Sequence, residues 1–277
     1  MPGILYLVPT PIGNLGDISR RCAEILEEAD FVAAEDTRVT LRLLNHMGLK
    51  KHLVSYHRHN VETGGKAVLE RLLAGENCAL VTDAGTPAIS DPGEDLVALC
   101  AANGVSVCAI PGPCALVVAL SVSGLPTARF TFEGFLPMNK KNRRAHLDSL
   151  KNEQRTMIFY EAPHKLLPTL SDFAAAFGED RRIALCRELT KLHEEVRRTT
   201  LGEALAWYEN NPPKGEFVLV VEGAAPEVKE SDPDAALERV AELREGGMAL
   251  KAACKQAGEE FGISKNQLYD MALENGI

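Results

Sequence analysis

The sequence predicts an α/β protein with two α/β domains followed by a small helical domain. Short apolar segments alternate with amphipathic segments over most of the chain. A polar, proline-containing stretch at 223–233 then precedes three short helical segments. The 277 residues suffice for two domains and a small third, and 45% hydrophobic with 25% charged residues is typical of globular proteins. We therefore expect an N-terminal α/β domain at 1–115, a second at 116–224 and a helical domain at 233–277.

The first domain should contain a mostly parallel sheet with helices on both faces, because its strands alternate with helices. Strands are expected at 4–8, 31–35, 53–56, 79–82 and 105–110. Helices are expected at 19–29, 37–47, 62–74 and 92–103. Ser19 and Thr37 should open the first two helices, and Pro92, after Asp91, should take the first position of the fourth. Three glycines fall where C-terminal caps belong, namely Gly48, Gly75 and Gly104.

The second domain should contain a mixed sheet. Strands are expected at 128–135, 156–161, 183–187, 195–201 and 217–222. Helices are expected at 143–150, 165–177 and 202–210. Antiparallel pairing is expected within 183–201, because that stretch holds two strands with no long helix between them.

The C-terminal domain resembles a helix-turn-helix unit. Helices are expected at 235–245, 250–261 and 265–274, with a glycine-containing turn before the last and Ser264 as its N-cap. Residues 227–274 carry eleven acidic against six basic side chains, which is unfavourable for contact with phosphates. This charge balance favours a packing or docking module over an independent nucleic-acid-binding domain.

The overall charge of −9 argues against nucleic-acid binding by the whole surface, but cations are clustered. Residues 38–61 contain no Asp or Glu, five Lys or Arg and four His, and a second basic cluster stands at 140–144. Such clusters in an acidic chain favour one face that meets the phosphates of RNA. The candidate RNA-binding residues are Arg38, Arg42, Lys50, Lys51, Arg58, Lys140, Lys141, Arg143 and Arg144.

The cysteines and the apolar segments indicate a cytoplasmic protein. Seven cysteines form no C-x-x-C pair and lie mostly in apolar segments, which is typical of core residues in a reducing compartment. No metal site is expected for the same reason. No apolar run approaches the roughly 20 residues of a membrane-spanning helix, so no membrane partner is expected.

Rigid or small residues follow five expected strands. The first strand leads into Val8-Pro9-Thr10-Pro11-Ile12-Gly13-Asn14, where two prolines stiffen the chain. No G-x-G-x-x-G and no P-loop occurs, so this loop suits a ligand bound by its flat or uncharged parts. The other four such segments stand at 82–93, 110–115, 132–137 and 160–165. Ligands of parallel sheets bind at the carboxyl ends of strands, so these segments predict the binding crevice.

The chain resembles the bacterial small-subunit ribosomal RNA 2′-O-methyltransferases of the tetrapyrrole-methylase superfamily, the class III methyltransferases. The resemblance spans residues 5–223 and rests on nine segments: VPTPIGNLGDIS, AEDTR, SYHRHN, TDAGTPAISDPG, IPGPCA, FEGFLP, YEAPHK, CRELTKLHEE and KGEFVLVVEG. It implies a bilobal tetrapyrrole-methylase-like fold with S-adenosylmethionine in a cleft between two α/β domains. Superfamily members use G-D-P after the fourth strand, whereas this chain has Gly85-Thr86-Pro87. That departure fits the RNA branch better than the corrin branch.

By motif position, the resemblance implies a set of cofactor contacts, many of them through backbone: Pro9, Thr86, Ala88, Ile89, Cys114, Ala115, Tyr160 and Gly215. Cys114 and Ala115 could instead form a tight helix start under the sheet. It also implies the substrate, the ribose 2′-hydroxyl of a cytidine in the decoding region of 16S ribosomal RNA. The assembled small subunit is the implied form of that RNA, and a homodimer is the implied oligomer.

A ribose hydroxyl is a very weak acid, so a base or a cation should lie near it. The candidate catalytic residues in the motifs are Glu35, Asp36, Glu133 and Lys165, with His57, Arg187 and Glu188 as further candidates. Glu35 and Asp36 could instead stabilise a helix N-terminus. Lys165 stands at a helix start, where a cation is unfavourable, which favours an anionic partner. Arg187 and Glu188 fit an internal ion pair better than direct catalysis.

Two other functions stay open on the residues alone. A methyltransferase for tetrapyrroles or other small molecules would keep the fold and the cofactor, and its acidic substrate could also meet the basic clusters. A non-enzymatic RNA-binding protein could use the helix-turn-helix-like tail. That function would leave the five strand-end segments without a role.

Overall fold

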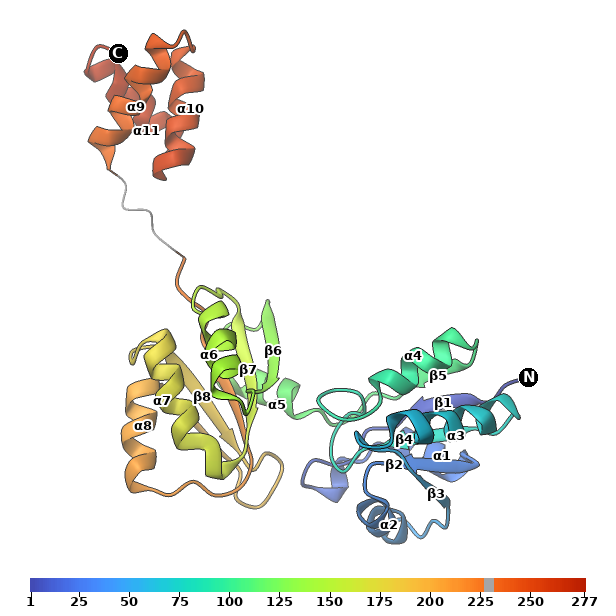
Figure 1. Cartoon of the computed structure of the whole chain (residues 1–277). Coiled ribbons are helices and arrows are strands. Elements are labelled where there is room, and N and C mark those ends of the chain that lie inside the picture. The colour runs from blue at the N-terminus through green and yellow to red at the C-terminus, as the bar shows by residue number, and fades with distance from the viewer. Residues whose placement is uncertain (227–231) are drawn as a thin grey trace. The chain divides into compact units, whose positions relative to one another are not determined.

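The computed structural model describes residues 1–226 and 232–277, which form two compact units, 1–224 and 225–277 (Figure 1). The expected linker at 223–233 falls partly on 227–231, outside the described residues. Among the residues that are described, no helix combines the length and the apolarity needed to span a membrane.

The N-terminal sheet has five parallel strands in the order β3-β2-β4-β1-β5. The strands are β1 (Ile4–Leu7), β2 (Phe31–Ala34), β3 (His52–Ser55), β4 (Cys78–Val81) and β5 (Ser106–Ala109). The helices are α1 (Arg20–Glu28), α2 (Thr37–His46), α3 (Val61–Leu73) and α4 (Glu94–Ala102). Residues of α1 and α2 join one core cluster and residues of α3 and α4 join another, so the helices cover opposite faces (Figure 1). The expected parallel sheet is confirmed.

Helix ends follow the expected signals with two exceptions. The Ser19 hydroxyl accepts the Cys22 amide at 3.1 Å, and Gly48, Gly75 and Gly104 follow their helices at φ of +72°, +100° and +69°. Thr37 is not a cap, because the Asp36 carboxylate accepts the Arg38 amide at 2.8 Å and caps α2.

The fourth helix starts later than the sequence predicts. Pro92 precedes α4, which begins at Glu94 with Gly93 as N-cap. The physical reason is that residues 88–92 fold back on themselves: the Ala88 amide donates to the Pro92 carbonyl at 3.3 Å, with positive φ at Ala88 and Ser90.

The second sheet is mixed, in the order β6-β7-β10-β8-β9. The strands are β6 (Phe130–Phe135), β7 (Thr156–Glu161), β8 (Arg182–Arg187), β9 (Glu195–Thr200) and β10 (Phe217–Val221). Only β6 and β7 pair in parallel, and β8 and β9 pair antiparallel as expected. One face carries α6 (Lys140–Ser149), α7 (Leu166–Phe177) and α8 (Leu201–Asn210).

The other face of the second sheet carries α5 (Ala115–Ser123), which is not among the helices expected from the sequence, although a helix start at Cys114 and Ala115 was one alternative. Leu116, Ala119 and Leu120 of this helix are buried against Ile158 and Val218. The helix is apolar on all sides, so it has no amphipathic period that a sequence pattern would reveal. Its first residues follow the I-P-G-P-C-A segment directly.

The C-terminal unit is a three-helix domain of α9 (Pro233–Glu245), α10 (Leu250–Phe261) and α11 (Lys265–Glu274). Small side chains dominate its core, including Ala253, Cys254 and Ala257. Gly262, at φ +68°, turns the chain between α10 and α11. The Ser264 hydroxyl accepts the Gln267 amide at 3.2 Å, which confirms the expected N-cap.

Candidate active site

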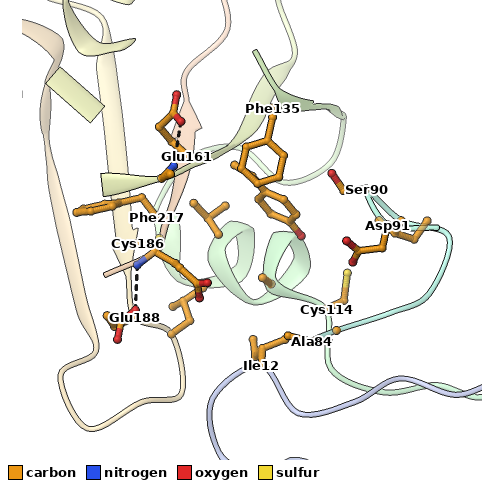
Figure 2. Close-up of a pocket in the computed structure, with 18 of the residues that line it drawn as sticks. Ile12, Ala84, Ser90, Asp91, Cys114, Phe135, Glu161, Cys186, Glu188 and Phe217 are labelled. Atoms are coloured by element: carbon orange, nitrogen blue, oxygen red, sulfur yellow. Dashed lines mark hydrogen bonds between the residues drawn. The ribbon is translucent and has the colours of Figure 1, made fainter. Parts of the chain in front are cut away.

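A cavity of about 280 Å³ lies where the two α/β halves of the first unit meet (Figure 2). The N-terminal half contributes Ile12, Ala84, Gly85, Thr86, Ile89, Ser90 and Asp91. The start of α5 contributes Cys114 and Ala115. The second half contributes Phe135, Tyr160, Glu161, Ala162, Cys186, Glu188, Leu189, Lys191, Glu216, Phe217 and Val218.

The topology of the N-terminal sheet explains the position of the cavity. Neighbouring strands β1 and β4 continue into α1 and α4, which cover opposite faces of the sheet. Their loops therefore diverge at the carboxyl ends and open a crevice, the usual ligand site of such sheets. An isolated bridge holds the two loops together, with the Thr10 amide donating to the Gly85 carbonyl at 2.9 Å.

Backbone strain concentrates in two loops that form opposite walls of the cavity. Over the described ranges, the non-glycine residues with positive φ are Ala88 at 67°, Ser90 at 67°, Glu188 at 51° and Thr190 at 64°. Such conformations cost about 1–3 kcal/mol each and persist only where the surroundings enforce them. Their restriction to these two loops supports the choice of this cavity as the candidate functional site.

A three-residue ion network shapes the wall from the second half. The Lys191 ammonium donates to the Glu188 carboxylate at 2.8 Å and to the Glu216 carboxylate at 2.9 Å. Lys191 thereby holds the pKa of Glu188 below its ordinary value. Gly13 and Gly215 pack on this network: a Cβ on either would stand 2.4 Å from the Cγ atom of Lys191 or Glu188, respectively.

Asp91 is the cavity carboxylate that has no hydrogen bond or ion pair within the described chain. Glu161 accepts from the Thr169 hydroxyl at 2.5 Å and the Ala162 amide at 2.9 Å, while Glu188 and Glu216 are bonded to Lys191. Burial, reinforced by the nearby Glu35 carboxylate, raises the pKa of Asp91 to about 6, against an opposing effect of Arg58. Figure 2 shows Asp91 and Glu188 on opposite sides of the cavity.

Tyr160 connects the second sheet to the start of α5. Its hydroxyl accepts the Leu116 amide at 3.2 Å, and its ring packs edge-on against Phe132 and Phe135 at centroid distances of 5.0 and 5.7 Å. Burial raises the pKa of this phenol above its ordinary value. Tyr160 thus presents an aromatic, uncharged surface to the cavity.

Residues 4–205 match the family described as Tetrapyrrole (Corrin/Porphyrin) Methylases. The chain belongs to this family. Residues 230–276 also match the RsmI C-terminal HTH domain. Curated relatives of this family member carry the name "Ribosomal RNA small subunit methyltransferase I". The Synechocystis protein is 48% identical over 98% of both chains, and that of Escherichia coli O157:H7 is 47% identical over 98% of this chain and 95% of its own.

Solved methylase structures share the fold. The methyltransferase CobJ has a TM-score of 0.62 at 18% identity, covering 80% of this chain and 95% of its own. The uroporphyrin-III-C-methyltransferase from Thermus thermophilus has a TM-score of 0.55 at 21% identity, covering 79% and 94%. At these identities the likeness concerns the fold alone, and it confirms the bilobal methylase fold that the sequence motifs imply.

In this tetrapyrrole methylase the expected cofactor residues lie in or beside the cavity. Five line it, namely Thr86, Ile89, Cys114, Ala115 and Tyr160. Pro9 packs on Gly112, where a Cβ would stand 2.7 Å from the Pro9 Cβ, and Ala88 lies in the strained loop. Gly215 contacts Glu188 behind the wall. Thr86, which stands where superfamily members have a carboxylate, donates its hydroxyl to the Pro113 carbonyl at 2.8 Å.

Further lining residues were not expected from the sequence. Asp91 stands in the T-D-A-G-T-P-A-I-S-D-P-G segment, but its place before Pro92 suggested only a helix opener. Phe135 and Ile12 also stand in motif segments. Lys191 stands in the C-R-E-L-T-K-L-H-E-E segment, but its pairing with Glu216 carried no signal, because the two residues are 25 positions apart in sequence.

None of the four expected catalytic residues lines the cavity. Asp36 caps α2 and pairs with Arg38 at 2.5 Å, which holds its pKa far below the ordinary value. Glu133 bonds His146 at 2.8 Å, and the Lys165 ammonium contacts the Met138 sulfur at 2.8 Å. Glu35 lies close enough to Asp91 to raise its pKa, and the pKa of Glu35 itself is raised by burial and by Asp83.

The expected RNA-binding residues of the N-terminal half separate into exposed and structural cations. Arg38 and Lys50 are exposed, and Arg42 lines a second cavity of about 230 Å³. Lys51 instead donates to the Ala29 carbonyl at 2.7 Å, beyond the end of α1, and to that of Glu27. Arg58 donates to the Ser90 carbonyl and thereby supports the strained loop.

The second half presents a basic groove of about 830 Å³ beside α6 and α7. Its cations are Lys140, Arg143, Arg144, Lys151 and Lys165. Arg143 is largely buried and bonds Asp172 at 2.5 Å and Thr169 at 2.8 Å, so its charge is already compensated. Lys141 does not line this groove.

Proposed function

We propose that this methylase transfers a methyl group from S-adenosylmethionine to the ribose 2′-hydroxyl of a cytidine in the decoding region of 16S ribosomal RNA. The observation that carries the substrate class is the full-length match, at 42 to 48% identity, to curated relatives named for the small-subunit ribosomal RNA. The proposal includes the assembled small subunit as the substrate form, a homodimer as the active species and the cytoplasm as its location.

The cavity fits S-adenosylmethionine in size and in chemistry. Its volume of about 280 Å³ is close to the lower end, about 300 Å³, of typical cofactor pockets. Ile12, Phe135 and Leu189 offer apolar surface to an adenine ring, and no side chain caps the first turn of α5 beside Cys114. When bound, S-adenosylmethionine supplies an electrophilic methyl group on a sulfonium centre.

Asp91 is our proposed proton acceptor for the attacking ribose hydroxyl. General-base catalysis requires a group that is ionised near neutral pH and retains basicity, which a carboxyl pKa of about 6 provides. Glu35 keeps this pKa high and Arg58 keeps it from rising further. Ser90, the residue before Asp91, has φ +67°, and Arg58 donates to its carbonyl, which supports the backbone that carries Asp91.

Exposed cations on both halves are proposed to hold the RNA backbone. Arg38, Arg42 and Lys50 are exposed on the N-terminal half, and Lys140 and Arg144 are exposed beside the groove of the second half, which the half-buried Lys165 also lines. The C-terminal domain carries an acidic excess, so we assign it to docking within the particle or dimer.

The test is methyl transfer from radiolabelled S-adenosylmethionine to small subunits purified from cells that lack this protein. Label in an alkali-resistant dinucleotide is the expected result, because a 2′-O-methyl group protects the adjoining phosphodiester. Cofactor binding without incorporation into RNA would overturn the proposal. A visible absorbance shift on mixing with a corrin or porphyrin would then support the small-molecule alternative.

A further inference from the structure

The loop between β8 and β9, residues 188–194, carries an almost fully exposed leucine. Leu192 is 93% exposed, more than any other large apolar residue of the described chain except the N-terminal Met1. Leu189 of the same loop is only 6% exposed and lines the active-site cavity. The loop therefore buries one leucine and presents the other to solvent, and no step of the proposed reaction uses Leu192.

Hydrogen bonds hold this loop in a defined conformation. Two tight turns follow each other: the Lys191 amide donates to the Glu188 carbonyl at 3.0 Å, and the Glu194 amide donates to the Lys191 carbonyl at 3.1 Å. Leu192 takes the first central position of the second turn. The Glu194 carboxylate also accepts the Thr190 amide at 2.6 Å, across the loop. The exposed side chain of Leu192 thus projects from a braced turn.

The loop forms part of the cavity wall and packs on the N-terminal half. Glu188, Leu189 and Lys191 line the cavity. A Cβ on Gly13 would stand 2.4 Å from the Lys191 Cγ atom and 3.1 Å from the Leu189 carbonyl oxygen, so the loop after β1 packs closely here. Leu192 follows Lys191 directly, and consecutive Cα atoms are about 3.8 Å apart. Leu192 therefore stands next to the cavity wall.

A ribose within an RNA strand has to leave its stacked neighbours to react in this cavity. Its 2′-hydroxyl must come within about 3–3.5 Å of the methyl group that it attacks. A cavity of about 280 Å³ is close in size to a cofactor pocket, so we expect the neighbouring bases to stay outside. The displaced nucleotide leaves a gap in the base stack. Proteins that separate stacked bases commonly insert an apolar side chain into such a gap.

An RNA base step fits Leu192 better than a second copy of the chain does. Stable protein interfaces bury about 800 Å² per partner around an apolar centre. The sequence neighbours of Leu192 are polar: His193 is exposed, and the Lys191 ammonium is paired with Glu188 at 2.8 Å. A single apolar side chain among polar ones makes a poor interface centre, but it suffices to separate two bases.

We propose that Leu192 is a wedge that enters the RNA base stack next to the methylated nucleotide and fills the space which that nucleotide leaves. The proposal rests on the proposed function, because it requires an RNA substrate. Leu192 is a positioning residue in this role. It touches neither the cofactor nor the reacting hydroxyl, and it holds the strand in the conformation that brings the ribose to the cavity.

Leu192→Ala tests the wedge without disturbing the fold, because the truncated side chain is 93% exposed. The melting temperature and the Kd for S-adenosylmethionine should equal those of wild type. The kcat/KM on small subunits should fall about tenfold, since a wedge offsets the loss of base stacking. Leu192→Met keeps an apolar side chain of similar volume and should restore most of the rate. Leu73→Ala, at an exposed leucine of α3, is the matched control without effect.

Small subunits reconstituted with one abasic nucleotide beside the methylated one separate a wedge from a merely structural role. Without that base, the methylated nucleotide has lost a stacking partner and leaves the stack more readily. The ratio of the wild-type rate to the Leu192→Ala rate should therefore approach one for an abasic position on one side of the methylated nucleotide.

Equal rates of Leu192→Ala and wild type on intact subunits would overturn the proposal, as would an unchanged ratio on both abasic forms. A change in the sedimentation coefficient of Leu192→Ala would also overturn it, because Leu192 would then belong to an interface between copies of the chain. Absence of ribose methylation by the wild-type protein would instead overturn the proposed function.

Discussion

The amides and carbonyls of Thr10 and Gly85 bond each other reciprocally, at 2.9 and 3.0 Å, and so join the loops after β1 and β4. These loops diverge to opposite faces of the sheet, so the bridge fixes the width of the crevice between them. The candidate active-site cavity and the second cavity beside α2 are lined from the two sides of this bridge. One backbone contact therefore positions the lining of both cavities.

Gly215→Ala should disrupt the cavity wall in two ways, through the positive-φ backbone and through a steric clash of the added Cβ with Glu188. Gly215 has φ +79°, and an added Cβ would stand 2.4 to 2.7 Å from the Glu188 side chain, which Lys191 holds in place. Gly104→Ala is the control, because Gly104 has φ +69° with nothing within 4 Å of the added Cβ. We expect about 1–2 kcal/mol of destabilisation from the left-handed backbone in both variants. Only Gly215→Ala should also weaken S-adenosylmethionine binding, measured by calorimetry.

Activity should fall on the acid side of about pH 6, because Asp91 must be ionised to accept a proton. Arg58→Met should move this acid limb to higher pH, since the Arg58 cation lowers the pKa of Asp91. The pH profile of kcat measures both effects. Profiles that coincide for the variant and the wild type would contradict this role of Arg58.

Asp91 should make the free energy of unfolding fall as pH rises. A salt-bridged carboxylate has the opposite effect. Its pKa is raised from 3.8 in the unfolded chain to about 6, so the folded state binds the proton more tightly. The contribution of Asp91 to the free energy of unfolding is therefore favourable below about pH 4 and is lost as pH rises through about 6. Asp91→Asn should remove this loss and stabilise the protein at pH 7, whereas the exposed Asp180→Asn should not. Urea unfolding at pH 4, 5, 6 and 7 measures the difference.

Adjacent lysines should respond differently to substitution. Lys50 is exposed, so Lys50→Ala should lower RNA affinity and reduce the slope of log K against log salt by about 0.7, as for one lost phosphate contact. Lys51 holds carbonyls near the end of α1, so Lys51→Ala should lower the melting temperature and leave that slope unchanged. Identical salt slopes for Lys50→Ala and wild type would remove Lys50 from the RNA surface.

Much of the fold could be predicted because its signals are local. The strands of the N-terminal sheet, the Ser19 and Ser264 caps and the glycines after the helices all follow from short sequence patterns. Helix α5 could not be predicted in this way, because it is apolar on all sides and is specified by burial against Ile158 and Val218. The expectation that Pro92 opens a helix was wrong for a related reason, since the folded-back residues 88–92 are supported by Arg58, which is 32 positions from Ser90 in sequence.

The candidate site was only partly predictable. The strand-end segments predicted the crevice, and five expected cofactor residues line the cavity. The choice of proton acceptor depends on which carboxylates already have partners. Lys191 satisfies Glu188 and Glu216 across the β8–β9 and β10 loops, and no local pattern reveals that pairing. Asp91 can be identified as the carboxylate without a partner in the cavity of the described chain only when those bonds are known.

The most direct test of the central claim, that this cavity performs methyl transfer with Asp91 as proton acceptor, is the single-turnover methylation rate of Asp91→Asn on small subunits. At saturating S-adenosylmethionine and pH 7.5 we expect a rate about 10²-fold or more below wild type, with cofactor Kd changed little. Asp91→Asn methylating at the wild-type rate would contradict the account.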